Sequence, residues 1–323
     1  RQPARYDDEL EICTRATRLS PVRIRFDYTL TRHGANLLAT GHTVHAAVDR
    51  TGRPCRLPAG VAALLEIALF RLELLALNDL TIAVTGGNLS PMVNGNPLPM
   101  WQTYFLKKGD RVVFRARKQG FRAYLAVQGG FFGQNFLGSR SVFVRGLMGS
   151  ILKAGEILET ESTGVKQTFP KFLAKEMIPP SPADNFLRVI LGPQEDRFTQ
   201  KGIETFLSSE YRVSPQSDRM GYRLQGPAVE HLHGADIISE PIARGAIQVP
   251  GDGLPILLLW DGQVSGGYTK IANIISADLD RVAQIMPGES LRFRAVTLEE
   301  AHGLLRKEWA YFEQAQKHLE EQR

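Results

Sequence analysis

The sequence predicts a mainly β protein, and three observations lead to this prediction. From Leu80 onward, short runs of β-branched and aromatic residues alternate with glycine-containing turns, as in strands joined by tight connections. Amphipathic helical patterns are few. A glycine, an acidic residue and a short apolar run occur together three times, which indicates a duplicated β-barrel unit. We therefore expect two barrel-like halves with a few helices and a C-terminal helix.

The predicted strands are bounded by glycine, proline or polar turn residues and are rich in valine, isoleucine, leucine and phenylalanine. They are Thr81–Val84, Arg111–Arg115, Arg122–Val127, Leu187–Leu191, Ile256–Trp260 and Leu291–Val296.

Four segments carry a helical pattern: Ala62–Leu77, Gly202–Ser208, Ser276–Gln284 with Ser276 as N-cap, and Leu298–Glu321. Charged residues interrupt the first segment, so it predicts an amphipathic or buried helix and not a membrane span. The last segment follows Thr297, which stands three residues before Glu300, and this spacing predicts a capping box.

The recurring pattern suggests how the chain is divided. Its copies are Gly109-Asp110-Arg111-Val112, Gly155-Glu156-Ile157-Leu158 and Gly288-Glu289-Ser290-Leu291. Residues 161–185 lie between the second and third copies and contain a cluster of prolines, which is typical of a linker. We expect one barrel-like half in residues 1–160, the linker at 161–185 and a second half in 186–323 with the C-terminal helix.

Bulk composition narrows the classes of partner and compartment. The 323 residues are 43% hydrophobic and carry a net charge of only +5, without a basic run that would track a phosphate backbone, so we expect neither a nucleic-acid nor a membrane partner. The two cysteines lack paired-ligand spacing, and a cytoplasmic protein without a disulfide framework or metal site is expected. His231 and His233 near Asp236 are a weak metal signal and fit a surface loop better.

Two segments contain groups that could bind an anion. In SDRMGYRL, Asp218, Arg219 and Arg223 could form a bidentate clamp for a carboxylate or phosphate, or an ion pair that only holds the loop. In LGSRS, Ser139 and Arg140 follow a glycine that can expose backbone N–H groups, so they form either an anion nest or an ordinary turn.

The segment 245–270 contains the strongest candidates for chemistry. Gln248 is an amide among apolar residues, and Gly266 and Gly267 let the backbone approach closely beside Tyr268 and Lys270. A lysine held there could neutralise a developing oxyanion or a transferred phosphoryl group, although a solvated lysine beyond a hairpin would give the same spacing.

Four segments are informative as an ordered set. They are AYLAVQGGF with LGSRS at 123–131 and 137–141, SDRMGYRLQGP at 217–227, the stretch at 239–279 that contains GGYTKI, and MPGESLRF at 286–293. Together they closely resemble the biotin-dependent carboxyltransferase family, which includes the C-type subunit of 5-oxoprolinase, the Kip antagonist, allophanate hydrolase subunit 2-like proteins and part of urea carboxylase. The resemblance implies cyclophilin-like barrel units.

It also implies an ATP-dependent hydrolase of a cyclic amide, a 5-oxoprolinase, that is inactive alone and acts with a B-type subunit and an A-type subunit. ATP would be shared with the partner, and the chain has no A-M-K-M-type biotin attachment site. The alternatives are a regulatory module that binds a kinase-inhibitor homologue, and the carboxyltransferase component of a urea carboxylase-like enzyme. For the enzyme we expect Lys270, Asp218 and Tyr268 to be catalytic. The expected substrate-binding residues are Ser139, Arg140, Arg219, Arg223, Gln248, Gly266 and Gly267.

The resemblance fails at residues 14–60. The family's T-x-Q-D-x-G-R-x-G and G-V-P-x-S-G-A-M-D segments are missing, and an arginine-rich, lysine-free block takes their place. Such a block is typical of a coding sequence read out of frame, and genuine divergence produces it equally well. Resequencing the coding DNA separates the two explanations, because an intact reading frame would rule out the first.

Overall fold

The structure is a computed structural model that describes the strands in residues 10–46 and 65–67 by their backbone, and residues 72–135, 139–143, 146–160, 170–179 and 184–322 in full. The chain forms two compact units. The first consists of residues 1–62 and 134–140, and the second of residues 63–133 and 141–323.

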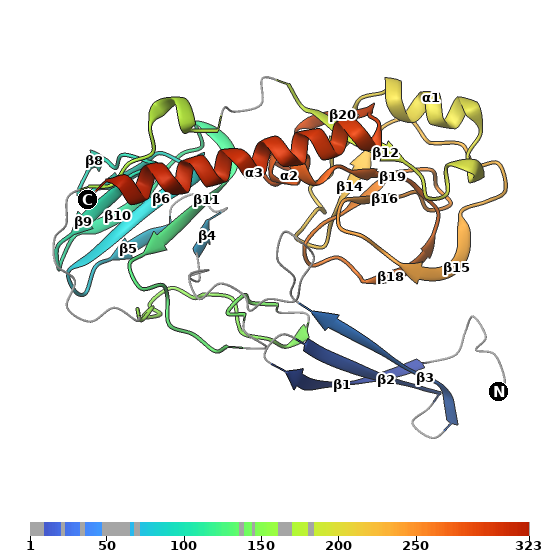
Figure 1. Ribbon diagram of the computed structural model, residues 1–323, viewed down its shortest axis with the longest axis horizontal. Coiled ribbons are helices and arrows are strands. Elements are labelled where there is room, and N and C mark those ends of the chain that lie inside the picture. The colour runs from blue at the N-terminus through green and yellow to red at the C-terminus, as the bar shows by residue number, and fades with distance from the viewer. Residues whose placement is uncertain are drawn as a thin grey trace. The chain divides into compact units, whose positions relative to one another are not determined.

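The first unit contains a three-stranded antiparallel sheet in the order β1-β2-β3 (Figure 1). Its strands are β1 (Leu10–Ser20), β2 (Arg23–Arg32) and β3 (Asn36–Ala46). The sequence block at 14–60 falls on this sheet and on residues outside the described ones.

The first half of the second unit encloses a core between two four-stranded sheets with the orders β5-β10-β7-β8 and β4-β11-β6-β9. Its strands are β4 (Leu65–Ile67), β5 (Glu73–Leu75), β6 (Leu80–Asn88), β7 (Pro91–Val93), β8 (Asn96–Pro97), β9 (Thr103–Leu106), β10 (Arg111–Phe114) and β11 (Gln119–Val127). Alternate residues of β6, β10 and β11 point into the core, among them Ile82, Val84, Phe114 and Leu125.

The predicted helix at Ala62–Leu77 is wrong, because β4 and β5 occupy this segment. Leu65, Glu66 and Ile67 pair with β11, while residues 73–75 pair with β10. Pairing with strands that come much later in the chain therefore overrides the local helical pattern, which a sequence window cannot detect.

The second half is a closed barrel with the strand order β12-β19-β16-β17-β14-β13-β20. Its strands are β12 (Phe186–Leu191), β13 (Tyr211–Val213), β14 (Gly221–Gln225), β16 (Ala246–Gln248), β17 (Ile256–Leu258), β19 (Lys270–Ile274) and β20 (Ser290–Ala295). A separate two-stranded ribbon is formed by β15 (Asp236–Pro241) and β18 (Ser265–Tyr268). The mainly β prediction is confirmed, as are the six predicted strands to within a few residues.

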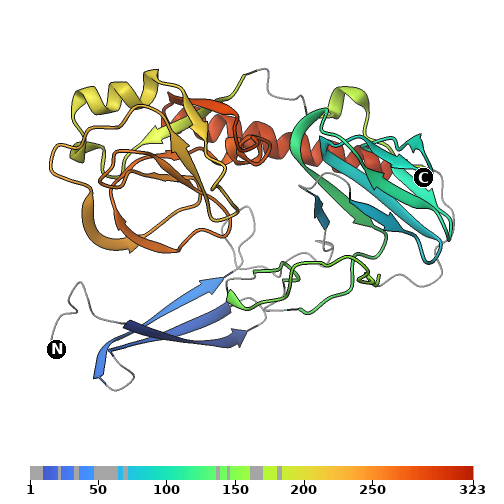
Figure 2. The same ribbon diagram turned by 180° about the vertical axis from the view of Figure 1, so that it is seen from behind.

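The remaining helices are close to prediction. Helix α1 (Gln200–Ser208) is capped by Thr199 and lies along the edge of the barrel (Figure 2). The predicted helix at 276–284 is a 3-10 turn, η4 (Ser276–Asp278), followed by α2 (Leu279–Ala283). Helix α3 (Leu298–Glu321) has the predicted bounds, and Thr297 and Glu300 form the predicted capping box.

The recurring glycine-acid pattern forms the same turn in each of its three copies. The acidic side chain accepts a hydrogen bond from the backbone N–H three residues earlier: Lys107 to Asp110 (2.8 Å), Lys153 to Glu156 (2.7 Å) and Met286 to Glu289 (2.8 Å). The intervening glycines have φ values of 95°, 86° and 94°, which favour glycine. Only the first and third turns lead into strands, β10 and β20, each with a buried phenylalanine at its fourth residue. The first and third copies therefore share both the turn and the strand that follows it, one in each half of the unit.

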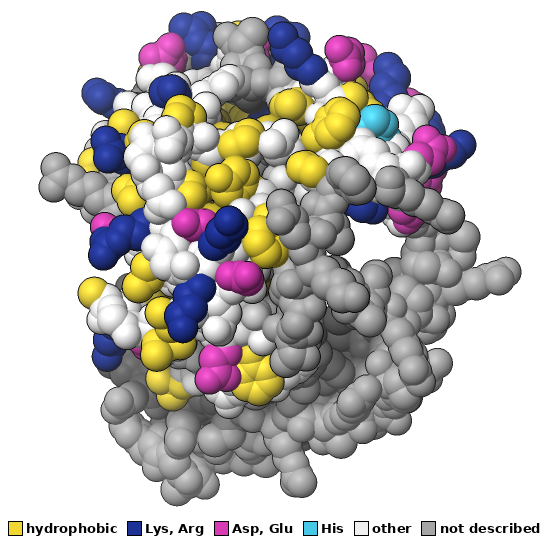
Figure 3. All heavy atoms as spheres, turned by 90° about the vertical axis from the view of Figure 1, so that its left-hand side faces the viewer, with side chains coloured by type: hydrophobic (Ala, Val, Ile, Leu, Met, Phe, Trp, Pro, Cys, Tyr) yellow, Lys and Arg dark blue, Asp and Glu magenta, His cyan; other side chains and the backbone are white. Residues whose placement is uncertain are grey.

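The other described features bear on the boundaries and the surface of the protein. The predicted linker at 161–185 is described at 170–179, which includes the 3-10 helix η2 (Lys175–Met177), and at 184–185, while the rest of it lies outside the described residues. The predicted domain boundaries stay a prediction. In the part of the chain that the structure describes, no helix is both long and apolar enough to cross a bilayer. On the face shown in Figure 3, the basic, acidic and hydrophobic side chains of the described residues are interspersed.

Two helical glycines give a matched test of local packing. A Cβ atom on Gly202 in α1 would lie 2.4 Å from the Glu230 carbonyl oxygen, whereas a Cβ on Gly303 in α3 would meet nothing within 4 Å. We expect Gly202→Ala to lower the free energy of unfolding by about 1–3 kcal/mol through overpacking. Gly303→Ala should raise it by up to about 1 kcal/mol, because alanine favours the helix. Urea denaturation measures both, and equal effects would contradict the packing seen here.

Candidate functional site

The candidate site is centred on Lys270, the first residue of β19. Its side chain is only 3% exposed, and its Nζ lies 2.7 Å from Oε1 of Glu240 on β15. Burial of an ammonium group is costly unless an opposite charge is close, and the carboxylate of Glu240 supplies that charge. The alternative of a solvated lysine does not describe this residue, because the side chain turns inward from the strand.

Gln194 links the carboxylate of Glu240 to the strand that carries Lys270. Its Nε2 donates to Glu240 Oε1 (2.7 Å), and its Oε1 accepts from the backbone N–H of Lys270 (3.1 Å). The contact with Lys270 and, next, the amide of Gln194 lower the pKa of Glu240 below its usual value. The acid is therefore held as a carboxylate beside the lysine.

Gln248 is the cross-strand partner of Lys270, from β16, and it is almost completely buried. Its Oε1 accepts from Nε2 of Gln263 (3.1 Å). Within the described residues, Nε2 of Gln248 has no hydrogen-bond acceptor, and the acidic partner of Lys270 Nζ is Glu240. Buried donors without acceptors are costly, and such groups often mark the position of a ligand.

Gly266 makes room beside the Gln248 amide. A Cβ atom on this glycine would lie 2.9 Å from Nε2 of Gln248, so any other residue would displace the amide or fill the space next to it. Gly267 follows on β18, close to the backbone of β15, with a hypothetical Cβ 3.1 Å from the Ile237 carbonyl oxygen. Tyr268 pairs with Asp236 across the ribbon and is 42% exposed.

The SDRMGYRL segment forms a second group. Asp218 is exposed and accepts from the backbone N–H of Met220 (2.8 Å), while Arg219 pairs with Asp261 (Nε to Oδ2, 3.0 Å). Arg223 points outward from β14, between the buried Tyr222 and Leu224. The alternative of an ion pair that holds the loop thus describes the contact of Arg219.

One loop joins the two groups. Asp261 contacts Arg219, and Gln263, two residues later, contacts Gln248. The structure thus brings Gln248, Gly266 and Lys270 together. Arg219 is held by Asp261, Arg223 points outward from β14, and Tyr268 pairs with Asp236 on the ribbon. Four residues that were not expected as site residues complete the arrangement. Gln194 lies outside the family-like segments, whereas Glu240, Asp261 and Gln263 lie within the stretch at 239–279.

Ser139 and Arg140 belong to the first compact unit, so their predicted place in the site stays a prediction. The predicted loop position of His231 needs refinement. Its Nε2 contacts the Val249 carbonyl oxygen (3.1 Å) and Thr269 Oγ1 (3.0 Å), and its ring packs on Phe198 at 4.7 Å. Burial lowers the pKa of His231, so the side chain acts as a neutral packing group.

The lowered pKa of Glu240 gives a pH-dependent prediction. A carboxyl group whose pKa is depressed by folding stabilises the protein above its unfolded-state pKa of about 4.5, and this contribution is lost as the pH falls through the folded-state value. We expect the wild-type protein to be more stable than Glu240→Gln at pH 7. The difference should shrink as the pH is lowered below 4.5. Thermal denaturation of both proteins across this range measures the effect, and a difference that does not change with pH would contradict it.

Comparison with known proteins identifies the family. The family model described as "Carboxyltransferase domain, subdomain A and B" matches residues 58–295. The chain is 34% identical over 262 residues to the C-type subunit of 5-oxoprolinase from Haemophilus influenzae, an alignment that covers 80% of this chain and 82% of that protein. The chain therefore belongs to the carboxyltransferase family, as the sequence motifs predict.

Solved structures agree with the assignment. The crystal structure of TTHA0988 is 35% identical with a TM-score of 0.64, and the match covers 72% of this chain and 46% of that one. The Kluyveromyces lactis urea carboxylase is 29% identical with a TM-score of 0.69, covering 75% of this chain and 24% of that one. The chain thus spans about half and about a quarter of the lengths of these two structures. The family match begins at residue 58, which leaves nearly all of the 14–60 block outside it.

Proposed function

We propose that the chain is the C-type subunit of an ATP-dependent 5-oxoprolinase and works with B-type and A-type subunits in the cytoplasm. Its relatives from Haemophilus influenzae and Escherichia coli, both named as the C-type subunit of 5-oxoprolinase, align over about four fifths of their length. The main structural support for the proposal is a pair of buried donors, Lys270 Nζ and Gln248 Nε2. They lie beside the space that the missing side chain of Gly266 leaves.

These donors suit the chemistry of opening a cyclic amide. The amide carbonyl is resonance-stabilised, and coupling to ATP requires negative charge to be carried on oxygen during phosphoryl transfer. A buried ammonium and a fixed amide N–H act strongly on such an oxygen because little water screens them. Glu240 and Gln194 hold the lysine in place, so its charge is oriented before the substrate arrives.

Carboxyl transfer to an amide such as urea is a second candidate, favoured by the likeness to urea carboxylase at 29% identity. The same two donors could bind the carbonyl oxygen of urea. The 323 residues contain no A-M-K-M-type biotin attachment motif, so the carboxyl group would be supplied from outside them.

The proposal is tested by co-expressing the chain with B-type and A-type subunits of a 5-oxoprolinase. ATP hydrolysis that depends on added 5-oxoproline supports it. Complex formation without such turnover would favour the regulatory binding module, and turnover with urea and carboxybiotin would favour the carboxyltransferase.

Assembly with the B-type subunit is a prediction in its own right. Obligate subunit interfaces usually bury about 2,000 Å² or more, so we expect one peak for the two proteins mixed at micromolar concentration. Size exclusion with light scattering measures the mass of that peak. Separate elution of the two proteins would contradict the prediction.

A further inference from the structure

A cavity in the second unit, between its first half and the helices α2 and α3, is separate from the Lys270 group. It has a volume of about 890 Å³ and lies between the sheet β4-β11-β6-β9, the segment 171–179, α2 and helix α3. This volume is within the range of small-molecule sites. Its lining includes none of the residues of the lysine site, so it needs an explanation of its own.

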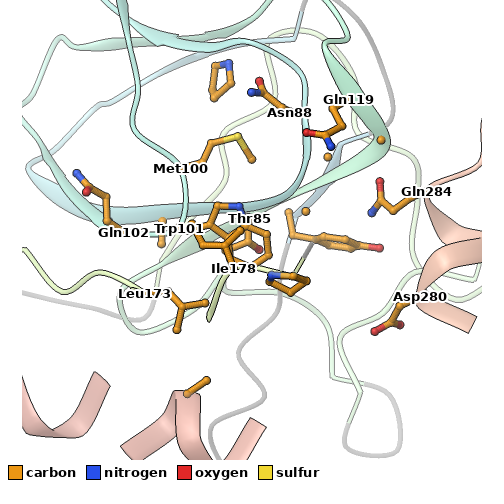
Figure 4. Close-up of a pocket in the computed structure, with 18 of the residues that line it drawn as sticks. Thr85, Asn88, Met100, Trp101, Gln102, Gln119, Leu173, Ile178, Asp280 and Gln284 are labelled. Atoms are coloured by element: carbon orange, nitrogen blue, oxygen red, sulfur yellow. The ribbon is translucent and has the colours of Figure 1, made fainter. Parts of the chain in front are cut away.

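Two amide side chains lie at one end of this cavity. Asn88 on β6 and Gln119 on β11 are directly opposite each other in the antiparallel ladder, and both line the cavity (Figure 4). Asn88 Oδ1 accepts from the backbone N–H of Ser90 (2.9 Å). Within the described residues, the side chain of Gln119 has no hydrogen-bond partner, nor does Nδ2 of Asn88. Two neighbouring amides can donate hydrogen bonds to, and accept them from, the polar edge of a heterocyclic ring.

The body of the cavity is apolar and aromatic. Trp101 and Met100 line it together with Leu173 and Ile178 (Figure 4). Tyr124 is also part of the lining. Aromatic and thioether groups of this kind stack well on a flat ring.

The backbone at two lining residues is strained. Ser90 and Trp101 have φ values of 51° and 62°, in the left-handed region that side chains rarely adopt, and the hydroxyl of Ser90 is buried without a partner among the described residues. Strain of this kind is often associated with binding sites.

One wall of the cavity is held by contacts from the barrel half. Gln284 Oε1 accepts from the backbone N–H groups of Phe121 (2.8 Å) and Arg122 (3.1 Å), and its Nε2 donates to the Arg122 carbonyl oxygen (3.0 Å). A Cβ atom on Gly120, which has a φ of 68°, would lie 2.6 Å from the same Oε1. Gln284 is therefore fixed against β11, which makes the cavity a preformed site.

We propose that this cavity binds the adenine nucleoside part of a nucleotide, with the base between the aromatic side chains and its polar edge on Asn88 and Gln119. The aromatic and amide side chains that line the cavity favour a flat, neutral ring that forms hydrogen bonds. The choice of adenine rests on the proposed function, which uses ATP. An amide side chain can contact N6 and N7 of adenine together. Lys118 and Lys171, which also line the cavity, supply positive charge for the phosphates.

The test is direct binding of adenosine to the full chain, without partner subunits or turnover. Isothermal titration should give a saturable affinity. Adenosine should also quench part of the tryptophan fluorescence of the wild-type protein, and Trp101→Phe should abolish this quenching. Asn88→Ala and Gln119→Ala should each weaken adenosine binding about tenfold or more. Gln225→Ala, an exposed amide on β14, is the matched control and should bind as the wild type does.

The outcomes separate this proposal from the proposed function. Absence of adenosine binding at millimolar concentration, equal binding of uridine, or unchanged binding by both amide variants would overturn it. Gln119→Glu, which keeps the size of the side chain and removes its donors, replaces Gln119→Ala if that variant does not fold. Adenosine binding by the chain alone, with no 5-oxoproline-dependent turnover in the complex, would sustain the cavity proposal and refute the 5-oxoprolinase.

Discussion

Replacement of Lys270 by methionine is expected to lower 5-oxoproline-dependent ATP turnover of the assembled complex by about a hundredfold or more. Methionine keeps most of the buried stem and removes the charge that lies 2.7 Å from Glu240. The fold should survive, because the freed carboxylate of Glu240 is 39% exposed and can be hydrated. The measurement is steady-state turnover, with circular dichroism and size exclusion to confirm folding and assembly.

Two further variants locate the effect. Lys201→Met removes an exposed lysine of α1 and should leave turnover unchanged, which controls for the loss of one positive charge. Gln248→Leu removes the second buried donor and should also lower turnover while assembly persists. If the Lys270→Met complex assembles and turns over at the wild-type rate, the ammonium has no part in the chemistry, and the site must be sought elsewhere.

Much of the fold could be predicted because its signals are local. The capping box at Thr297 and Glu300 fixes the start of α3, and the glycine-acid turns before β10 and β20 are set by their own side chains. The helix predicted at 62–77 failed for the opposite reason. Its residues pair with strands about 40 to 60 positions later in the chain. Because strand pairing stabilises this segment through such distant residues, its own sequence does not reveal the strands.

The site was predictable only in part, for a related reason. Gly266, Gly267 and Lys270 stand in one short motif, and Gln248 is recognisable as an amide in an apolar strand. Glu240, which holds Lys270, precedes it by thirty residues and sits in an ordinary polar stretch. Gln194 comes from a still more distant connection. Only the closed barrel and its ribbon bring these side chains together, so spacing could not identify them.

Replacement of Phe206 by alanine is expected to lower the free energy of unfolding by about 3–5 kcal/mol, the usual cost of emptying a buried phenylalanine site. Phe206 of α1 is fully buried, and its ring stacks on Phe293 of β20 with centroids 4.4 Å apart. The ring of Tyr211 on β13 belongs to the same cluster, with its centroid 6.3 Å from that of Phe206. The cavity left by the truncation would therefore be bordered by α1, β13 and β20. Phe132→Ala, at a phenylalanine that is 63% exposed, makes the same chemical change at the surface and should cost far less. Urea denaturation gives both values from the shift in midpoint, provided that the slope is unchanged. Equal losses in the two variants would mean that α1 is not packed into the barrel as described, because only burial distinguishes the two side chains.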